Sequence, residues 1–168
     1  MQLLLIRHAV AEDAEVFAET GQDDAQRPLT KPGKWKMQRI AKTLHRTVGS
    51  IDVLAASPLV RASQTAEIVA QAFGGLEVVI TGTLEPQASF DSFLTWLRKQ
   101  RAADVVAVVG HEPHLGGLAT WLMTANDESR VRLGKGGAAL LEFEGKPGAG
   151  AAMLQWALTP ALLRRLAD

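Results

Sequence analysis

The stretch Leu3-Leu4-Leu5-Ile6-Arg7-His8 places four consecutive apolar residues directly before an arginine and a histidine. A short, uninterrupted apolar run predicts a strand that is buried on both faces, which is typical of a parallel sheet covered by helices. In such sheets, ligands bind beyond the carboxyl ends of the strands. Arg7 and His8 therefore follow the first strand at the edge of the sheet where a binding site is expected.

The rest of the chain alternates between strand and helix patterns. Short apolar runs predict further strands at residues 52–56, 77–80 and 105–109. A polar, irregular segment at residues 9–30 predicts a surface loop with room for a short helix. Apolar residues at three- and four-residue spacing predict helices at residues 32–48, 62–73, 89–101 and from Pro113 onward.

The C-terminal quarter has a different pattern. Residues 138–143 and 151–158 predict two strands joined by a glycine- and proline-containing turn, and Thr159-Pro160 predicts the start of a short last helix. The whole order predicts an α/β fold, a three-layer α/β/α sandwich with a mostly parallel central sheet and an antiparallel C-terminal hairpin. We expect residues 1–168 to form a single domain, because domains cluster at roughly 100–200 residues.

Composition narrows the function classes. With 47% hydrophobic and 21% charged residues, the chain is not of the disordered class. The 18 Lys+Arg against 18 Asp+Glu give no net charge, which argues against a nucleic-acid partner. The absence of cysteine excludes disulfides, thiol nucleophiles and iron–sulfur clusters. Without a signal-peptide pattern or an apolar run of ~18 residues, we expect a cytoplasmic protein with no membrane partner.

Further candidate site residues follow the other predicted strands. Ser57 and, at a helix start, Arg61 follow the second strand, and Gly110-His111-Glu112 follows the strand at 105–109. Guanidinium groups suit the paired oxygens of a phosphate, and an imidazole serves as nucleophile, acid or base near neutral pH. The sequence thus predicts a phosphate pocket that contains histidine, built from Arg7, His8, Arg61 and His111.

Three segments resemble the histidine phosphatase superfamily, which shares its fold with the phosphoglycerate mutases: Leu5-Ile6-Arg7-His8-Ala9, Ser57-Pro58-Leu59-Val60-Arg61-Ala62-Ser63-Gln64-Thr65-Ala66 and Val109-Gly110-His111-Glu112-Pro113. A fourth, Arg27-Pro28-Leu29-Thr30-Lys31-Pro32-Gly33, resembles a segment of the small SixA-type phosphohistidine phosphatases. One departure is Ala9, which stands where the superfamily usually has glycine.

The resemblance implies a role for each matched residue. His8 would be the nucleophile that becomes transiently phosphorylated, Arg7 and Arg61 would bind the phosphoryl oxygens, and His111 would complete the pocket. Arg27 would be either a third phosphate or substrate contact, or a loop arginine in solvent or in a structural salt bridge. No metal or other cofactor is expected, because the arginines neutralise the phosphoryl charge.

The proton donor stays open at this point. Many superfamily members use a carboxylic acid to protonate an alkoxide leaving group, and Glu85, after the third strand, is the first candidate. Glu12, Asp13 and Glu112 are its rivals. A phosphohistidine substrate needs less help, because its imidazole can leave already protonated.

The sequence is compatible with three functions. The favoured one is a signal-transduction phosphatase that removes phosphate from a protein phosphohistidine, with a phosphotransfer domain or a phosphotransferase-system protein as partner. The alternatives are a phosphatase for small phosphate esters and a non-catalytic phosphoprotein-binding module. His114 near His111 raises a metal site as a weaker interpretation, but the His-x-x-x-His spacing of zinc enzymes is absent. Gly134-Lys135-Gly136-Gly137 lacks the end of a phosphate-binding loop and predicts a turn before a strand.

Overall fold

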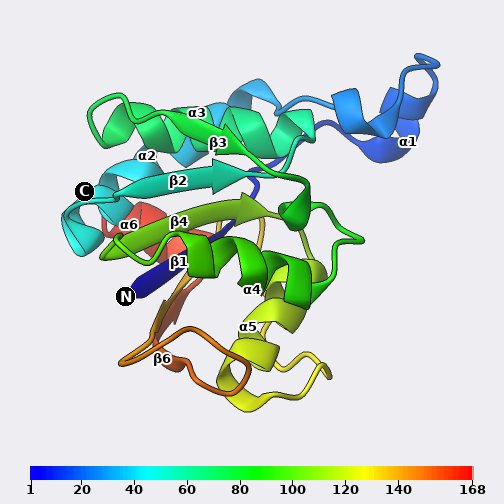
Figure 1. Cartoon of the computed structure of the whole chain (residues 1–168). Helices are drawn as coiled ribbons and strands as arrows, with labels where there is room; N and C mark the ends of the chain where they lie inside the picture. Colours follow the sequence, from blue (N-terminus) through cyan, green and yellow to red (C-terminus); the bar gives the residue numbers. More distant parts are fainter. Residues whose placement is uncertain (168) are drawn as a thin grey trace.

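A computed structural model describes residues 1–167 and has one six-stranded sheet at its centre (Figure 1). Its strands are β1 (Gln2–Arg7), β2 (Val53–Ala56), β3 (Val78–Ile80), β4 (Val105–Gly110), β5 (Ala138–Glu142) and β6 (Met153–Leu158). Their order across the sheet is β3-β2-β4-β1-β5-β6. The first four strands are parallel, and β5 and β6 are antiparallel to their neighbours. The predicted mixed sheet with a C-terminal hairpin is confirmed.

Helices cover both faces of the sheet, which confirms the three predicted layers. They are α1 (Ala14–Ala18), α2 (Lys31–Val48), α3 (Val60–Ala72), α4 (Phe90–Lys99), α5 (His114–Thr124) and α6 (Pro160–Arg165), with short 3-10 turns η1 (Asp24–Gln26) and η2 (Gly82–Leu84). One apolar core lies between the sheet and α2, α3 and α6, and a second lies between the sheet and α4 and α5 (Figure 1).

β1 contributes to both cores. Leu4 and Ile6 pack into the core under α2 and α3, whereas Leu3 and Leu5 pack into the core under α4 and α5. All four side chains are fully buried, so the strand is fixed in the sheet by apolar contacts on both sides. Its parallel register with β4 pairs Arg7 with Gly110, which brings the two strand-end motifs together.

The helix boundaries follow the capping signals in the sequence. The Thr30 side chain accepts a hydrogen bond from the backbone of Gly33 at the start of α2, and Thr159 does the same at α6 for Leu162. Gly49 ends α2 with a φ of 84°, a conformation that favours glycine. One boundary differs: α5 begins at His114, and Pro113 is its N-cap rather than its first residue.

The predicted loop at residues 9–30 contains α1 and η1 and projects from the sheet edge beside α3 (Figure 1). Residues 12–27 of this loop are called the arm below. The arm holds six carboxylates and no lysine, and its single arginine is its last residue. Backbone contacts at its base anchor it, since Glu12 N–H donates to the carbonyl of Pro28 and Ala11 pairs with Leu29.

Within residues 1–167, no helix combines the length and the apolar character that a membrane crossing requires.

A substitution at Gly33 tests the packing of α2 against this loop. A Cβ atom at Gly33 would collide with the backbone carbonyl of Val10, two residues after His8. We expect Gly33→Ala to lower the free energy of unfolding by about 1–3 kcal/mol, the usual cost of overpacking. Gly145→Ala is the matched control, because no atom lies within 4 Å of its Cβ position. Denaturant unfolding of both variants checks this, and equal stabilities would contradict the described packing.

Candidate active site

A cavity of about 540 Å³ opens at the carboxyl edge of the parallel strands. Its lining unites all four residues expected there, and it includes Arg7, His8, Val10, Ala11, Glu12, Asp13, Ala14, Arg27, Arg61, Pro86, His111, Glu112 and Lys135. A slightly larger hollow of about 590 Å³ lies near Met1 and Asp104, at the opposite ends of β1 and β4, and contains no histidine. The candidate chemistry therefore belongs to the smaller cavity, where the imidazoles and guanidinium groups converge.

His8 is held as a neutral imidazole with one free nitrogen. Its side chain is buried, and Nδ1 lies 2.7 Å from the carbonyl oxygen of Ala9, a geometry in which Nδ1–H donates. Nε2 then carries the lone pair. Burial lowers the pKa of His8 from 6.5 to about 4; the bond to Ala9 opposes this shift, and the charges of Arg61, Arg7 and Lys135 add to it. Burial and the nearby cations both keep the ring uncharged, and burial has the larger effect.

His111 faces His8 across the cavity, with their ring centroids 5.2 Å apart. Its Nε2 lies 2.8 Å from the hydroxyl oxygen of the fully buried Ser57. Its Nδ1 is buried without a hydrogen-bond partner. Burial is the main cause that lowers the pKa of His111 to about 3. The second imidazole is also neutral at physiological pH, with a polar atom that lacks a partner.

Arg7 and Arg61 are each anchored by a hydrogen bond from NH1 to a backbone carbonyl. Arg7 donates from NH1 to the carbonyl of Leu133 at 2.7 Å, and Arg61 donates from NH1 to the carbonyl of Asp24 at 2.9 Å. The Nε atom of each arginine is buried and has no partner. An unpaired buried donor on a charged group is costly, and an acceptor oxygen of a ligand could satisfy each of these two atoms.

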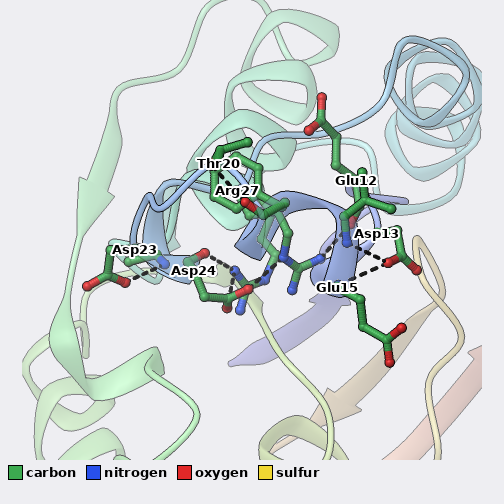
Figure 2. Close-up of polar contacts among 11 residues, drawn as sticks. Glu12, Asp13, Glu15, Thr20, Asp23, Asp24 and Arg27 are labelled. Atoms are coloured by element: carbon green, nitrogen blue, oxygen red, sulfur yellow. Dashed lines mark hydrogen bonds and ion pairs between the residues drawn. The ribbon is translucent and has the colours of Figure 1, made fainter.

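The arginine of the arm also lies at the cavity. Arg27 donates from Nε to Asp24 Oδ1 at 2.6 Å and from NH1 to the carbonyl of Glu12 at 2.8 Å (Figure 2). Of the two sequence interpretations, the cavity lining agrees with a ligand contact and the Asp24 pair with a structural salt bridge. The sequence pattern does not distinguish Asp24, because it is one of six carboxylates in the arm.

The candidate proton donors are placed differently from one another. Glu85 is exposed and does not line the cavity; its Oε1 lies beside Gly82 of its own turn. Glu112 lines the cavity, but its Oε1 accepts from the backbone N–H of Leu133. Glu12 and Asp13 are exposed residues of the rim, and Asp13 Oδ1 caps α1. Of the four candidate donors, Glu12, Asp13 and Glu112 line the cavity and Glu85 does not.

The remaining motifs have structural roles. His114 Nε2 lies 3.1 Å from the carbonyl oxygen of Ala88, and its ring packs against Phe90. Among residues 1–167, no group of three or more histidines and carboxylates is arranged to hold a metal ion.

The glycine-rich segment 134–137 is a turn before β5, as predicted, and Gly136 N–H donates toward the carbonyls of Arg7 and His8. This turn also brings Lys135 to the cavity, a residue that the motif pattern did not identify.

Comparison with known proteins identifies the class of protein that this fold and site define. The model of the histidine phosphatase superfamily (branch 1) matches residues 3–88. An uncharacterized protein from Picosynechococcus sp. strain PCC 7002 is 34% identical over 139 residues, which are 82% of this chain and 82% of that protein. The chain belongs to the histidine phosphatase superfamily, and the resemblance stated from its motifs is confirmed.

Solved structures share its fold. The protein histidine phosphatase SixA complexed with tungstate matches with a TM-score of 0.83 and 24% identity, over 97% of this chain and 99% of that one. The alpha-ribazole phosphatase from Shigella flexneri matches with a TM-score of 0.75 and 20% identity, over 95% of this chain and 97% of that one. The fold is thus common to phosphatases of different substrates.

The buried histidines predict how stability depends on pH. An unfolded chain titrates near the ordinary histidine pKa of 6.5, whereas burial lowers the pKa of His8 to about 4 and of His111 to about 3. Below pH 6.5 the unfolded chain therefore binds protons that the folded chain does not, and burial of His114 acts in the same direction. The free energy of unfolding should fall as the pH drops from about 6.5 toward 4.

Denaturant titrations across this pH range measure the effect. His8→Asn should retain the fall but with a smaller slope, because one of the titrating groups is removed. A free energy of unfolding that stays constant over this range would contradict the described burial.

Proposed function

We propose that this protein is a phosphohistidine phosphatase in which His8 is the nucleophile. The observation that carries the proposal is the free Nε2 of a buried, neutral His8, set among arginines whose Nε atoms lack partners. A nucleophilic imidazole must present a lone pair, and a transferring phosphoryl group requires hydrogen-bond donors around its oxygens. This pocket supplies both.

The first step is attack by His8 on the phosphorus atom. The new bond forms from His8 Nε2 to phosphorus while the phosphorus–nitrogen bond of the substrate breaks, and the substrate imidazole takes the electron pair of that bond. Water then attacks the phosphoryl group on His8, and the electron pair of the breaking phosphorus–nitrogen bond returns to Nε2. Inorganic phosphate leaves with both protons of the water molecule. Arg7 and Arg61 hold the phosphoryl oxygens throughout, and Arg27 is a third contact from the arm. The charge is neutralised by these side chains, so the proposed reaction uses no metal.

His111 donates to a phosphoryl oxygen in this proposal. Ser57 Oγ accepts a long hydrogen bond from the backbone N–H of Leu59 at 3.4 Å, so its own proton is available for His111 Nε2. With Nε2 accepting, Nδ1 carries the proton and becomes the donor that faces the ligand. In the proposal, the hydrogen bond from Ser57 holds His111 in this tautomer.

The placement of Glu112 and Glu85 favours phosphohistidine over a phosphate ester as substrate. Glu112 is engaged with the backbone, and Glu85 does not line the cavity. A phosphohistidine protonated on its other ring nitrogen leaves as neutral imidazole, whereas an alkoxide requires an acid. The rim residues Glu12, Asp13 and Lys135 are exposed, which suits a phosphohistidine presented on the surface of a cytoplasmic partner protein, such as a phosphotransfer domain or a phosphotransferase-system protein.

A phosphatase for small phosphate esters is the second candidate. Glu12 and Asp13 line the cavity and are the carboxylates that an ester would require as acid. A fold match to an alpha-ribazole phosphatase is compatible with this alternative.

Comparing rates on a phosphohistidine protein and on a panel of phosphate esters separates the two functions. We expect the wild-type protein to prefer phosphohistidine, and His8→Ala to lower the rate by about a thousandfold or more. His45→Ala, on the exposed side of α2, is the matched control and should keep the wild-type rate. A preference for esters would overturn the phosphohistidine assignment, and an active His8→Ala variant would overturn the nucleophile.

A further inference from the structure

We propose that Asp24 is a positioning residue, which aligns Arg27 and Arg61 for the phosphoryl group. This inference rests on the proposed function, because it assigns those two arginines to the phosphoryl oxygens. It concerns a residue of the arm that no motif of the sequence distinguishes.

Asp24 is the junction between the arm and α3. One carboxylate oxygen, Oδ1, accepts from Arg27 Nε at 2.6 Å, and the other, Oδ2, lies 3.1 Å from Arg61 NH1. The backbone carbonyl of Asp24 accepts from the same NH1 at 2.9 Å. A single residue thus contacts two of the three arginines that line the cavity.

The other carboxylates of the arm do not share this arrangement. Figure 2 shows the Asp24 side chain turned toward Arg27, while the carboxylates of Glu12, Glu15 and Asp23 point away from it. Asp23 accepts from the backbone of Ala25 and caps η1, in the same way that Asp13 caps α1. Bridging two arginines therefore distinguishes Asp24 within the arm.

The bridge fixes the orientation of both guanidinium groups. Two acceptors on Arg61 NH1 hold the plane of the group and leave the edge with the unpartnered Nε for a ligand. Arg27 is held at Nε by Asp24 and at NH1 by the carbonyl of Glu12. Free arginine side chains have many rotamers, so fixing them before the ligand arrives removes much of that entropic cost from binding.

The charge of Asp24 has an opposite effect, because a carboxylate repels an incoming phosphoryl group. Its side chain is 55% exposed, so solvent screens this repulsion. The hydrogen bond from Arg27 is the main cause that lowers the pKa of Asp24, so the carboxylate stays ionised and paired at neutral pH. Alignment of the arginines is therefore the larger effect of this residue.

Affinity for inorganic phosphate, measured by calorimetry, tests the proposal without requiring turnover. We expect Asp24→Ala to weaken phosphate binding about tenfold, the order of effect seen when groups that orient functional side chains are removed. Asp24→Asn keeps an acceptor but not the charge, so its affinity for phosphate should lie between those of Asp24→Ala and the wild type. With a phosphohistidine substrate, kcat/KM should fall in the same order.

Asp23→Ala is the matched control, since it removes an equal charge one position away and also removes the cap of η1. We expect it to bind phosphate as the wild type does. Equally weakened phosphate binding in Asp23→Ala and Asp24→Ala would assign the effect to folding of the arm. Tighter phosphate binding in Asp24→Ala would show that Asp24 competes with the ligand. Either result overturns the proposal. If the wild type hydrolyses no phosphohistidine yet binds phosphate, the proposed function fails while the affinities still decide the role of Asp24.

Discussion

The register between β1 and β4 is the constraint on which the rest of the site depends. Pairing Arg7 with Gly110 places the residues that follow each strand side by side, and His8 N–H donates to the carbonyl of Gly110 at 3.0 Å. The register is fixed because Leu3 to Ile6 are buried on alternating sides in two cores. A slip by one residue would exchange the two faces of β1 and separate the imidazoles, so apolar packing sets the geometry of the polar site.

Burial has a second consequence at this edge of the sheet. The removal of water keeps His8 and His111 neutral, and it leaves the Nε atoms of Arg7 and Arg61 and Nδ1 of His111 without partners. Unsatisfied buried donors destabilise a folded protein unless a ligand supplies acceptors. In the proposed function, a phosphoryl group supplies the acceptors that these groups lack, and their fixed arrangement favours both its binding and its transfer.

Much of the fold and the centre of the site could be predicted from the sequence, because the signals are local. The apolar run in β1 and the apolar spacing in α2 predict those elements, and the positions after the strands indicate His8, Arg61 and His111 as candidates. The place of Asp24 between two arginines could not be predicted, since it depends on the path of an irregular loop. The contact between Ser57 and His111 could not be predicted either, because it depends on side-chain geometry across two strands. Glu85 follows a strand as expected, yet its side chain lies against its own turn, a choice that the sequence does not encode locally.

Detection of the phosphoenzyme tests the central claim most directly. The protein is mixed with a phosphohistidine protein, quenched rapidly at alkaline pH to preserve phosphoramidates, and mapped by mass spectrometry. The account predicts a transient phosphate on His8, stable in base and lost in acid, that appears before inorganic phosphate is released. A phosphate on another residue, or release of inorganic phosphate with no phosphorylated His8 at the earliest times, would contradict it.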